Sequence, residues 1–150
     1  MDDAVVSLLD FMPTFADISG AKLPERELDG QSMIPVIETG KMDRDKPLSW
    51  AFYDAINEHR VAMRTDDWKI LARVKTDTSY LPLIHNLHEG NEYLVKQANL
   101  VDFELYNMNI DIGEAENVAE KHPEKLEEMK NILTTEYNNL LEGSHIWSRK

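Results

Sequence analysis

The feature that most constrains the fold is a stretch of alternating apolar and polar residues at positions 61–73, VAMRTDDWKILAR. A period of two is typical of β-strands, because successive side chains point to opposite faces. The interruption at 65–67 predicts a turn, since Asp tolerates the positive φ of a tight hairpin better than most residues. We therefore expect a hairpin with one apolar face, formed by Val61, Met63, Trp68, Ile70 and Ala72.

The second strong pattern is a long helix predicted from Pro123 to Gly143. Proline suits the first turn of a helix, and glycine commonly ends one. Apolar residues recur every three or four positions and give the helix one apolar face: Leu126, Met129, Leu133, Tyr137 and Leu140. Strands followed by such a helix predict an α+β fold, a small antiparallel sheet of about four strands packed by the long C-terminal helix.

Shorter elements are predicted on either side of the hairpin. A helix is expected at 11–19, with Asp10 as its cap and Gly20 as its left-handed stop. Strands are expected at 48–53 and 103–108, and short helices or helical turns at 32–37, 92–98 and 114–120.

The charge balance of the chain argues against two classes of partner. The 150 residues carry 16 Lys and Arg against 28 Asp and Glu, a formal net charge of −12. Nucleic acids and anionic membrane surfaces both attract basic proteins, so we expect binding to neither. There is no cysteine, which excludes disulfides and thiolate ligands. No apolar run approaches the roughly 18 residues of a membrane span, so none is expected.

Four segments in sequence order resemble the C-terminal part of sulfatases of the arylsulfatase type. They are LLDFMPTFADISGAKLP at 8–24, LDGQSMIPVIETGK at 28–41, AMRTDDWKIL at 62–71 and FELYNMNIDIGEAENVAEKHPEKLEEM at 103–129. The corresponding family patterns are D-x-x-P-T, D-G-x-S, R-x-x-x-W-K and E-L-Y-(D/N)-(L/M), followed by D-x-x-E-x-x-N-(V/L)-A. Each pattern alone is weak, but together, in this order, they extend over most of the chain, from residue 8 to residue 129.

The resemblance implies an organisation into two parts. Residues 1–40 would be the trailing segment of an α/β catalytic domain, and residues 41–150 would be the small C-terminal subdomain. The chain would then be a fragment of a sulfuric ester hydrolase that completes the fold and lines the substrate cleft. Its partner would be the catalytic domain of the parent enzyme. The family is often exported to the periplasm, the extracellular space or the lysosome, and the compartment of this chain stays open.

The resemblance also shows which catalytic parts this sequence lacks. In the family the nucleophile is a formylglycine made from the Cys or Ser of a C/S-x-P-S/T-R motif, and a calcium ion stabilises the sulfate charge. Phe11–Phe15 reads FMPTF and has the Pro-Thr pair, but neither the nucleophile nor the Arg. The family's calcium ligands lie upstream of the matched region. Calcium and formylglycine are therefore expected in an intact family enzyme, and no cofactor, metal ligand or catalytic residue is assigned in this chain.

The candidate substrate-binding residues are His59 and Arg60, just before the hairpin. The resemblance places them beside the active-site cleft, where either side chain could hold a sulfate or sugar oxygen by a charge-assisted hydrogen bond. An ordinary surface loop is the alternative. Other patterns have plainer explanations as solvated or core residues: Asp2 and Asp3, the His85 and His88 pair, and Trp50, Trp68 and Trp147.

Two further expectations follow from the sequence. Phe11, Phe15 and Ile18 fall on one face of the predicted N-terminal helix. Without a catalytic domain to cover them they would be exposed, and an exposed apolar patch favours association, so self-association is expected. The alternative to a sulfatase fragment is a stand-alone module, derived from a sulfatase subdomain, that binds a protein or a glycan.

Overall fold

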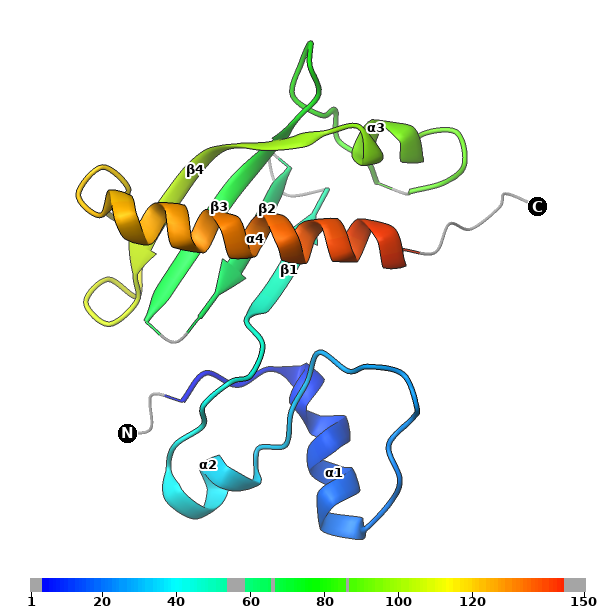
Figure 1. Ribbon diagram of the computed structural model, residues 1–150, viewed down its shortest axis with the longest axis vertical. Coiled ribbons are helices and arrows are strands. Elements are labelled where there is room, and N and C mark those ends of the chain that lie inside the picture. The colour runs from blue at the N-terminus through cyan, green and yellow to red at the C-terminus, as the bar shows by residue number, and fades with distance from the viewer. Residues whose placement is uncertain (1–3, 54–58, 66, 86, 145–150) are drawn as a thin grey trace. The chain divides into compact units, whose positions relative to one another are not determined.

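The computed structural model describes residues 4–53, 59–65, 67–85 and 87–144. The chain divides into two compact units, Met1–Leu48 and Ser49–Lys150. Figure 1 shows the helical first unit and the second unit with its sheet and long helix. Each unit is considered by itself. None of the described helices is both long and apolar enough to cross a bilayer.

The first unit consists of short helices joined by irregular segments. A 3-10 helix, η1 (Leu8–Asp10), leads into α1 (Phe11–Ser19), and α2 (Ile34–Thr39) follows. The predicted helix at 11–19 is confirmed. Gly20 ends α1 with a φ of 68°, in the left-handed region that favours glycine, and its N–H donates to the carbonyl of Ala16.

Asp10 does not cap α1 with its side chain, so this part of the prediction is wrong. Its carboxylate accepts hydrogen bonds from the backbone N–H groups of Ser7 at 2.7 Å and Gln31 at 3.0 Å. It also binds the guanidinium of Arg44 through two contacts, at 2.8 and 3.1 Å. Both side chains are almost fully buried. This ion pair ties residue 44 to the first unit. The predicted division at residue 40, between a catalytic domain and its C-terminal subdomain, stays a prediction.

Thr14 and Gly30 hold the loop after α1 in place. The hydroxyl of Thr14 donates to the carbonyl of Asp10 at 2.6 Å and accepts from the N–H of Met33 at 2.9 Å. At Gly30 the backbone passes so close to η1 that an added Cβ would lie 2.0 Å from the carbonyl oxygen of Leu9. Only glycine fits there without a shift of the backbone.

The second unit is a four-stranded antiparallel sheet with α4 (Pro123–Gly143) packed on one face (Figure 1). The strands lie in chain order, β1 (Leu48–Phe52), β2 (Arg60–Arg64), β3 (Trp68–Lys75) and β4 (Asn99–Asn107). The predicted hairpin is β2–β3, with Met63 opposite Ile70. The predicted α+β class, with a small antiparallel sheet and a long C-terminal helix, is confirmed.

The core lies between the sheet and α4. Met63, Ile70, Leu105 and Leu133 are completely buried. They belong to one cluster with the inward residues of the strands and with Met129 and Tyr137 of α4. The apolar stripe predicted for the last helix is therefore the face that packs on the sheet, although Leu140 at its end is exposed. Burial of this kind stabilises by about 25 cal/mol per Å² of apolar surface removed from water.

The connection from β4 to α4 is held by two polar side chains. Asn117 accepts through Oδ1 from the N–H groups of Leu105, at 3.1 Å, and Ala119, at 3.0 Å. Asp111 accepts from the N–H groups of Ala115 and Glu116 in the same way. These bonds lower the pKa of Asp111 against a smaller opposing effect of burial. The helical turn predicted at 114–120 is wrong. The side chains of Asp111 and Asn117 accept hydrogen bonds from backbone N–H groups that a helix would use.

The segment between β3 and β4 contains one short helix. This helix is α3 (Glu92–Lys96), near the position predicted for a helix at 92–98. Val95 is buried in the core, and Leu81 and Ile84 from the preceding irregular chain join it there.

Candidate functional site

The two predicted substrate-binding residues point to opposite faces of the sheet. Arg60 is the first residue of β2 and His59 precedes it, and neighbouring residues of an extended chain alternate in direction. His59 shares its side with the core residues Val61 and Met63, whereas Arg60 lies on the face that α4 does not cover. The described chain therefore does not bring the two side chains together on one surface.

His59 is buried, with only 4% of its surface exposed. Its Nε2 atom hydrogen-bonds to the carbonyl of Pro82, and its ring lies 6.2 Å from the ring of Tyr53, centroid to centroid. Its Nδ1 atom is buried without a partner among the described residues. These contacts fix the ring between β2 and the segment that follows β3.

Arg60 forms an ion pair on the outer face of the sheet. Its Nη1 atom lies 3.2 Å from Oε2 of Glu104, which also accepts a hydrogen bond from the hydroxyl of Tyr106 at 2.8 Å. Burial and the Glu104 carboxylate together raise the pKa of Tyr106 to about 12. Tyr106 therefore stays protonated at neutral pH and keeps donating to Glu104.

Arg60 belongs to a group of cations that sequence reasoning missed. The residues of β2 and β3 that point away from α4 include five cations, called here the basic face: Arg60, Arg64, Lys69, Arg73 and Lys75. The two strands contain no acidic residue, although the whole chain has a net charge of −12. The even spacing of the cations along each strand was the signal that could have revealed them.

The other candidate residues do not assemble into a metal site in the described part of the chain. The segment holding His85 and His88 is not helical, so the spacing of the two residues does not place them on one helix face. Nδ1 of His88 accepts from the N–H of Gly90 at 2.9 Å. Over the described ranges, no group of three His, Asp or Glu side chains could hold a metal ion. Asp2 and Asp3 lie outside the described residues.

The three tryptophans differ in their surroundings. Trp50 is 39% exposed, and the ammonium of Lys69 lies 5.5 Å from its ring centroid. Trp68 packs at the margin of the core, with its ring 5.1 Å from that of His122 in an edge-on arrangement. Trp147 lies outside the described residues. Trp50 is thus the tryptophan with a ring open to a ligand in the described structure.

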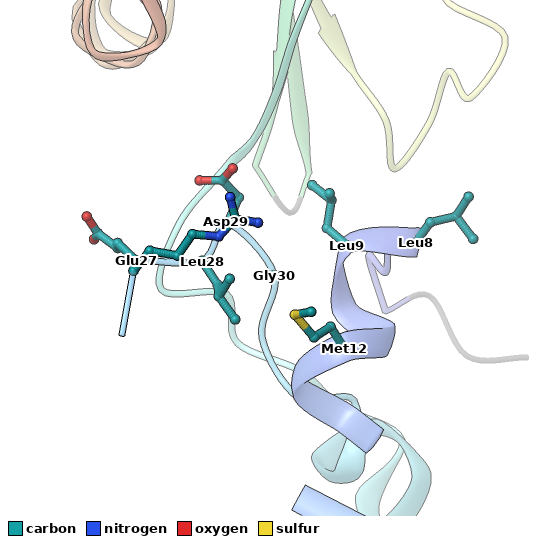
Figure 2. Close-up of a pocket in the computed structure, with 8 residues that line it drawn as sticks. Leu8, Leu9, Met12, Glu27, Leu28, Asp29 and Gly30 are labelled. Atoms are coloured by element: carbon teal, nitrogen blue, oxygen red, sulfur yellow. The ribbon is translucent and has the colours of Figure 1, made fainter. Parts of the chain in front are cut away.

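The first unit exposes several large apolar side chains. Phe11 and Phe15 stack at 5.8 Å between ring centroids and are 44% and 61% exposed, and Ile18 is 64% exposed. The same unit has a cavity of about 330 Å³ with a mixed lining of apolar and charged residues: Leu8, Leu9, Met12, Arg26, Glu27, Leu28, Asp29 and Gly30. Figure 2 shows the loop at 27–30 facing Leu9 and Met12 of the helical segment.

Comparison with known proteins finds similarity to sulfatases. The chain is 30% identical over 125 residues to a sulfatase of Formosa agariphila, a match that covers 79% of this chain and 19% of that protein. The chain is homologous to a part of the sulfatases. It is also 29% identical over 139 residues to an N-acetylglucosamine-6-O-sulfatase of Bacteroides thetaiotaomicron, covering 87% of the chain and 21% of that sulfatase. No family model matches.

A solved structure supports the fold. A protein solved in complex with its substrate, D-glucosamine-2-N,6-O-disulfate, superposes with a TM-score of 0.55 at 22% identity. The match covers 87% of this chain and 24% of the solved one. The chain thus spans about a fifth of the length of the curated sulfatases that it matches.

The residues that carry the sulfatase resemblance have structural roles here. Asp10 and Thr14 of the D-x-x-P-T segment and Gly30 of the D-G-x-S segment lock the first unit together. Asp111 and Asn117 of the E-L-Y and N-V-A segment hold the connection into α4. The segments that resemble sulfatases therefore help to hold the fold of this chain together.

Proposed function

We propose that this chain serves as part of a sulfatase-family sulfuric ester hydrolase, completing its fold and lining one wall of the substrate cleft. It has no sulfate-ester hydrolase activity by itself, because the sequence contains no C/S-x-P-S/T-R motif. The catalytic domain of a sulfatase is its proposed partner and supplies the formylglycine and the calcium ion.

The observation that carries this proposal is the exposed apolar surface of the first unit. Monomeric soluble proteins seldom expose large contiguous apolar patches, and those that exist mark interaction sites. Phe11, Phe15 and Ile18 follow one face of α1 at helical spacing, which is the pattern of a helix that packs on another element. The relatives are about five times longer than the matched region, so they contain the structure that could cover such a face.

The names of two relatives support a sulfated sugar as the substrate class. One is an N-acetylglucosamine-6-O-sulfatase, and another was solved with D-glucosamine-2-N,6-O-disulfate. The role proposed for His59 and Arg60 in substrate binding stays a prediction. The burial of His59 and the pairing of Arg60 with Glu104 mean that either residue would reach a sugar only after giving up a present contact.

We expect no hydrolysis of an aryl sulfate by the purified chain in the presence of calcium. The control is a complete sulfatase, assayed in the same buffer, which must release product. Turnover above that of the buffer, retained after a further purification step, would contradict the proposal. It would show that the chain contains a reaction centre of its own.

A further inference from the structure

The basic face contains two pairs of like charges that lie directly opposite each other. In the β2–β3 register Arg60 pairs with Arg73, and Arg64 pairs with Lys69. Directly opposed residues of an antiparallel pair have their Cβ atoms about 5 Å apart, and like charges at that position destabilise a sheet. The sequence therefore departs twice from the local rule for a stable sheet, as functional surfaces often do.

Three carboxylates offset part of this repulsion. Glu104 pairs with Arg60 at 3.2 Å, and Glu114 with Lys69 at 2.6 Å. A bulge in β4 gives Asp102 a φ of 51° and brings its carboxylate to 3.6 Å from Arg73. These contacts leave Arg64 and Lys75 without an ion pair in the described structure. The Nε atom of Arg64 is a buried donor with no partner among those residues.

Aromatic rings flank the cations. Trp50 lies beside Lys69. The ring centroid of Tyr80 lies 3.9 Å from the guanidinium carbon of Arg73 and 5.3 Å from Nζ of Lys75. Trp50 and Tyr80 are 39% and 42% exposed, so each keeps part of its ring open to a ligand. A surface with exposed rings next to cations offers both apolar contact and charge-assisted hydrogen bonds.

We propose that the basic face binds a sulfated polysaccharide chain. Sulfate esters are anions at every physiological pH, and their oxygens accept hydrogen bonds from the N–H groups of arginine and lysine. The two like-charge pairs lie four positions apart along β2, about 13 Å at 3.3 Å per residue, and an extended polyanion is long enough to span both. Bound sulfate relieves the repulsion within each pair, and the exposed rings pack on sugar rings.

Charge complementarity favours this ligand, and the ring contacts favour it over an acidic peptide. The chain as a whole is strongly acidic, so among the described strands the basic face is a surface that attracts a polyanion. The carboxylates of an acidic peptide would form ion pairs with the cations but would not pack on the aromatic rings of Trp50 and Tyr80. The choice of a sulfated sugar rests on the proposed function, which supplies that substrate class.

The test is calorimetric titration of the whole chain at low salt with a heparin oligosaccharide. The same oligosaccharide after chemical desulfation and a polyglutamate of similar charge are the comparison ligands. We expect binding of heparin that weakens strongly at about 0.3 M NaCl, where the Debye length falls to roughly 6 Å. We expect no heat with the desulfated sugar.

Two double variants separate the basic face from charge in general. Arg64→Gln with Arg73→Gln removes one cation from each like-charge pair and should weaken heparin binding by about tenfold or more. Lys125→Gln with Lys130→Gln removes the same charge from α4 and should leave the affinity within about twofold. Arg64→Gln alone should not lower the melting temperature, because it removes a repulsion and breaks no described ion pair.

Each alternative result decides against the proposal. Absence of heparin binding at low salt overturns it, as does equal weakening in the α4 variant. Equal affinity for polyglutamate assigns the face to an acidic protein instead. These results concern binding by the chain itself and do not depend on its role in a hydrolase, so failure here is distinct from failure of the proposed function.

Discussion

Replacing Asp10 by Asn is expected to destabilise the first unit by about 3–5 kcal/mol. The carboxylate is completely buried and accepts two bonds from Arg44, whose side chain is only 5% exposed. Asparagine keeps the size of the side chain but leaves the buried guanidinium without a counter-charge. Hydrogen exchange of the amides at 31–33, read by mass spectrometry, reports the loss directly, because the N–H of Gln31 donates to Asp10.

The matched control is Asp17→Asn on the exposed side of α1, the helix that follows Asp10, which should change stability by less than about 0.5 kcal/mol. The contribution of Asp10 should also depend on pH. Burial raises its pKa, but the bonds from Arg44, Gln31 and Ser7 outweigh burial and hold the pKa below the ordinary 3.8. The stabilisation is therefore full well above pH 3.8 and disappears as the pH falls through the lower folded-state value. A cost below about 1 kcal/mol at neutral pH would contradict the pairing.

Replacing Leu133 by Ala is expected to cost the second unit about 2–5 kcal/mol. Leu133 is completely buried where α4 meets the sheet, so truncation leaves a cavity lined by core side chains. Urea unfolding followed by tryptophan fluorescence measures this unit selectively. All three tryptophans, Trp50, Trp68 and Trp147, lie after residue 48.

Leu140→Ala is the control on the same helix. Leu140 is 40% exposed, and its truncation should cost less than about half as much as that of Leu133. Equal costs for the two variants would show that α4 does not pack on the sheet through the face formed by Met129, Leu133 and Tyr137.

Local patterns were sufficient to predict the hairpin and the long C-terminal helix of this fold. The alternation at 61–73 and the spacing of Leu126, Met129 and Leu133 each depend on residues within one element. Burial then follows from the period, because only one face of each element can reach the core. The hairpin and the long helix were therefore predictable, as was their combination in one α+β layer.

Contacts between distant residues were not predictable in this way. Asp10 and Arg44 are 34 positions apart, and nothing in either neighbourhood indicates the other. At 114–120 the sequence favours a helical turn, but the side chains of Asp111 and Asn117 accept hydrogen bonds from the backbone N–H groups there. The backbone conformation of this segment depends on side-chain hydrogen bonds, which intrinsic helix propensity does not describe.

In the candidate site, too, the local pattern was visible in the sequence but the spatial arrangement of the side chains was not predicted. His59 and Arg60 were grouped because they are neighbours in sequence, but the pleat of a strand sends neighbours to opposite faces. The basic face was missed because it requires the register that places Arg60 opposite Arg73 and Arg64 opposite Lys69. Once the hairpin was predicted, that register could have been written down, and the two like-charge pairs would have been visible in the sequence.

The claim that the first unit carries an interface for the rest of a sulfatase is tested most directly by light scattering of the purified chain over a range of high concentrations. The account predicts self-association, because Phe11, Phe15 and Ile18 expose the apolar surface that we propose to be covered in an intact sulfatase. The double variant Phe15→Gln with Ile18→Gln should shift the chain towards the monomer and leave the unfolding of the second unit unchanged. A wild-type chain that stays strictly monomeric at every concentration would contradict the account.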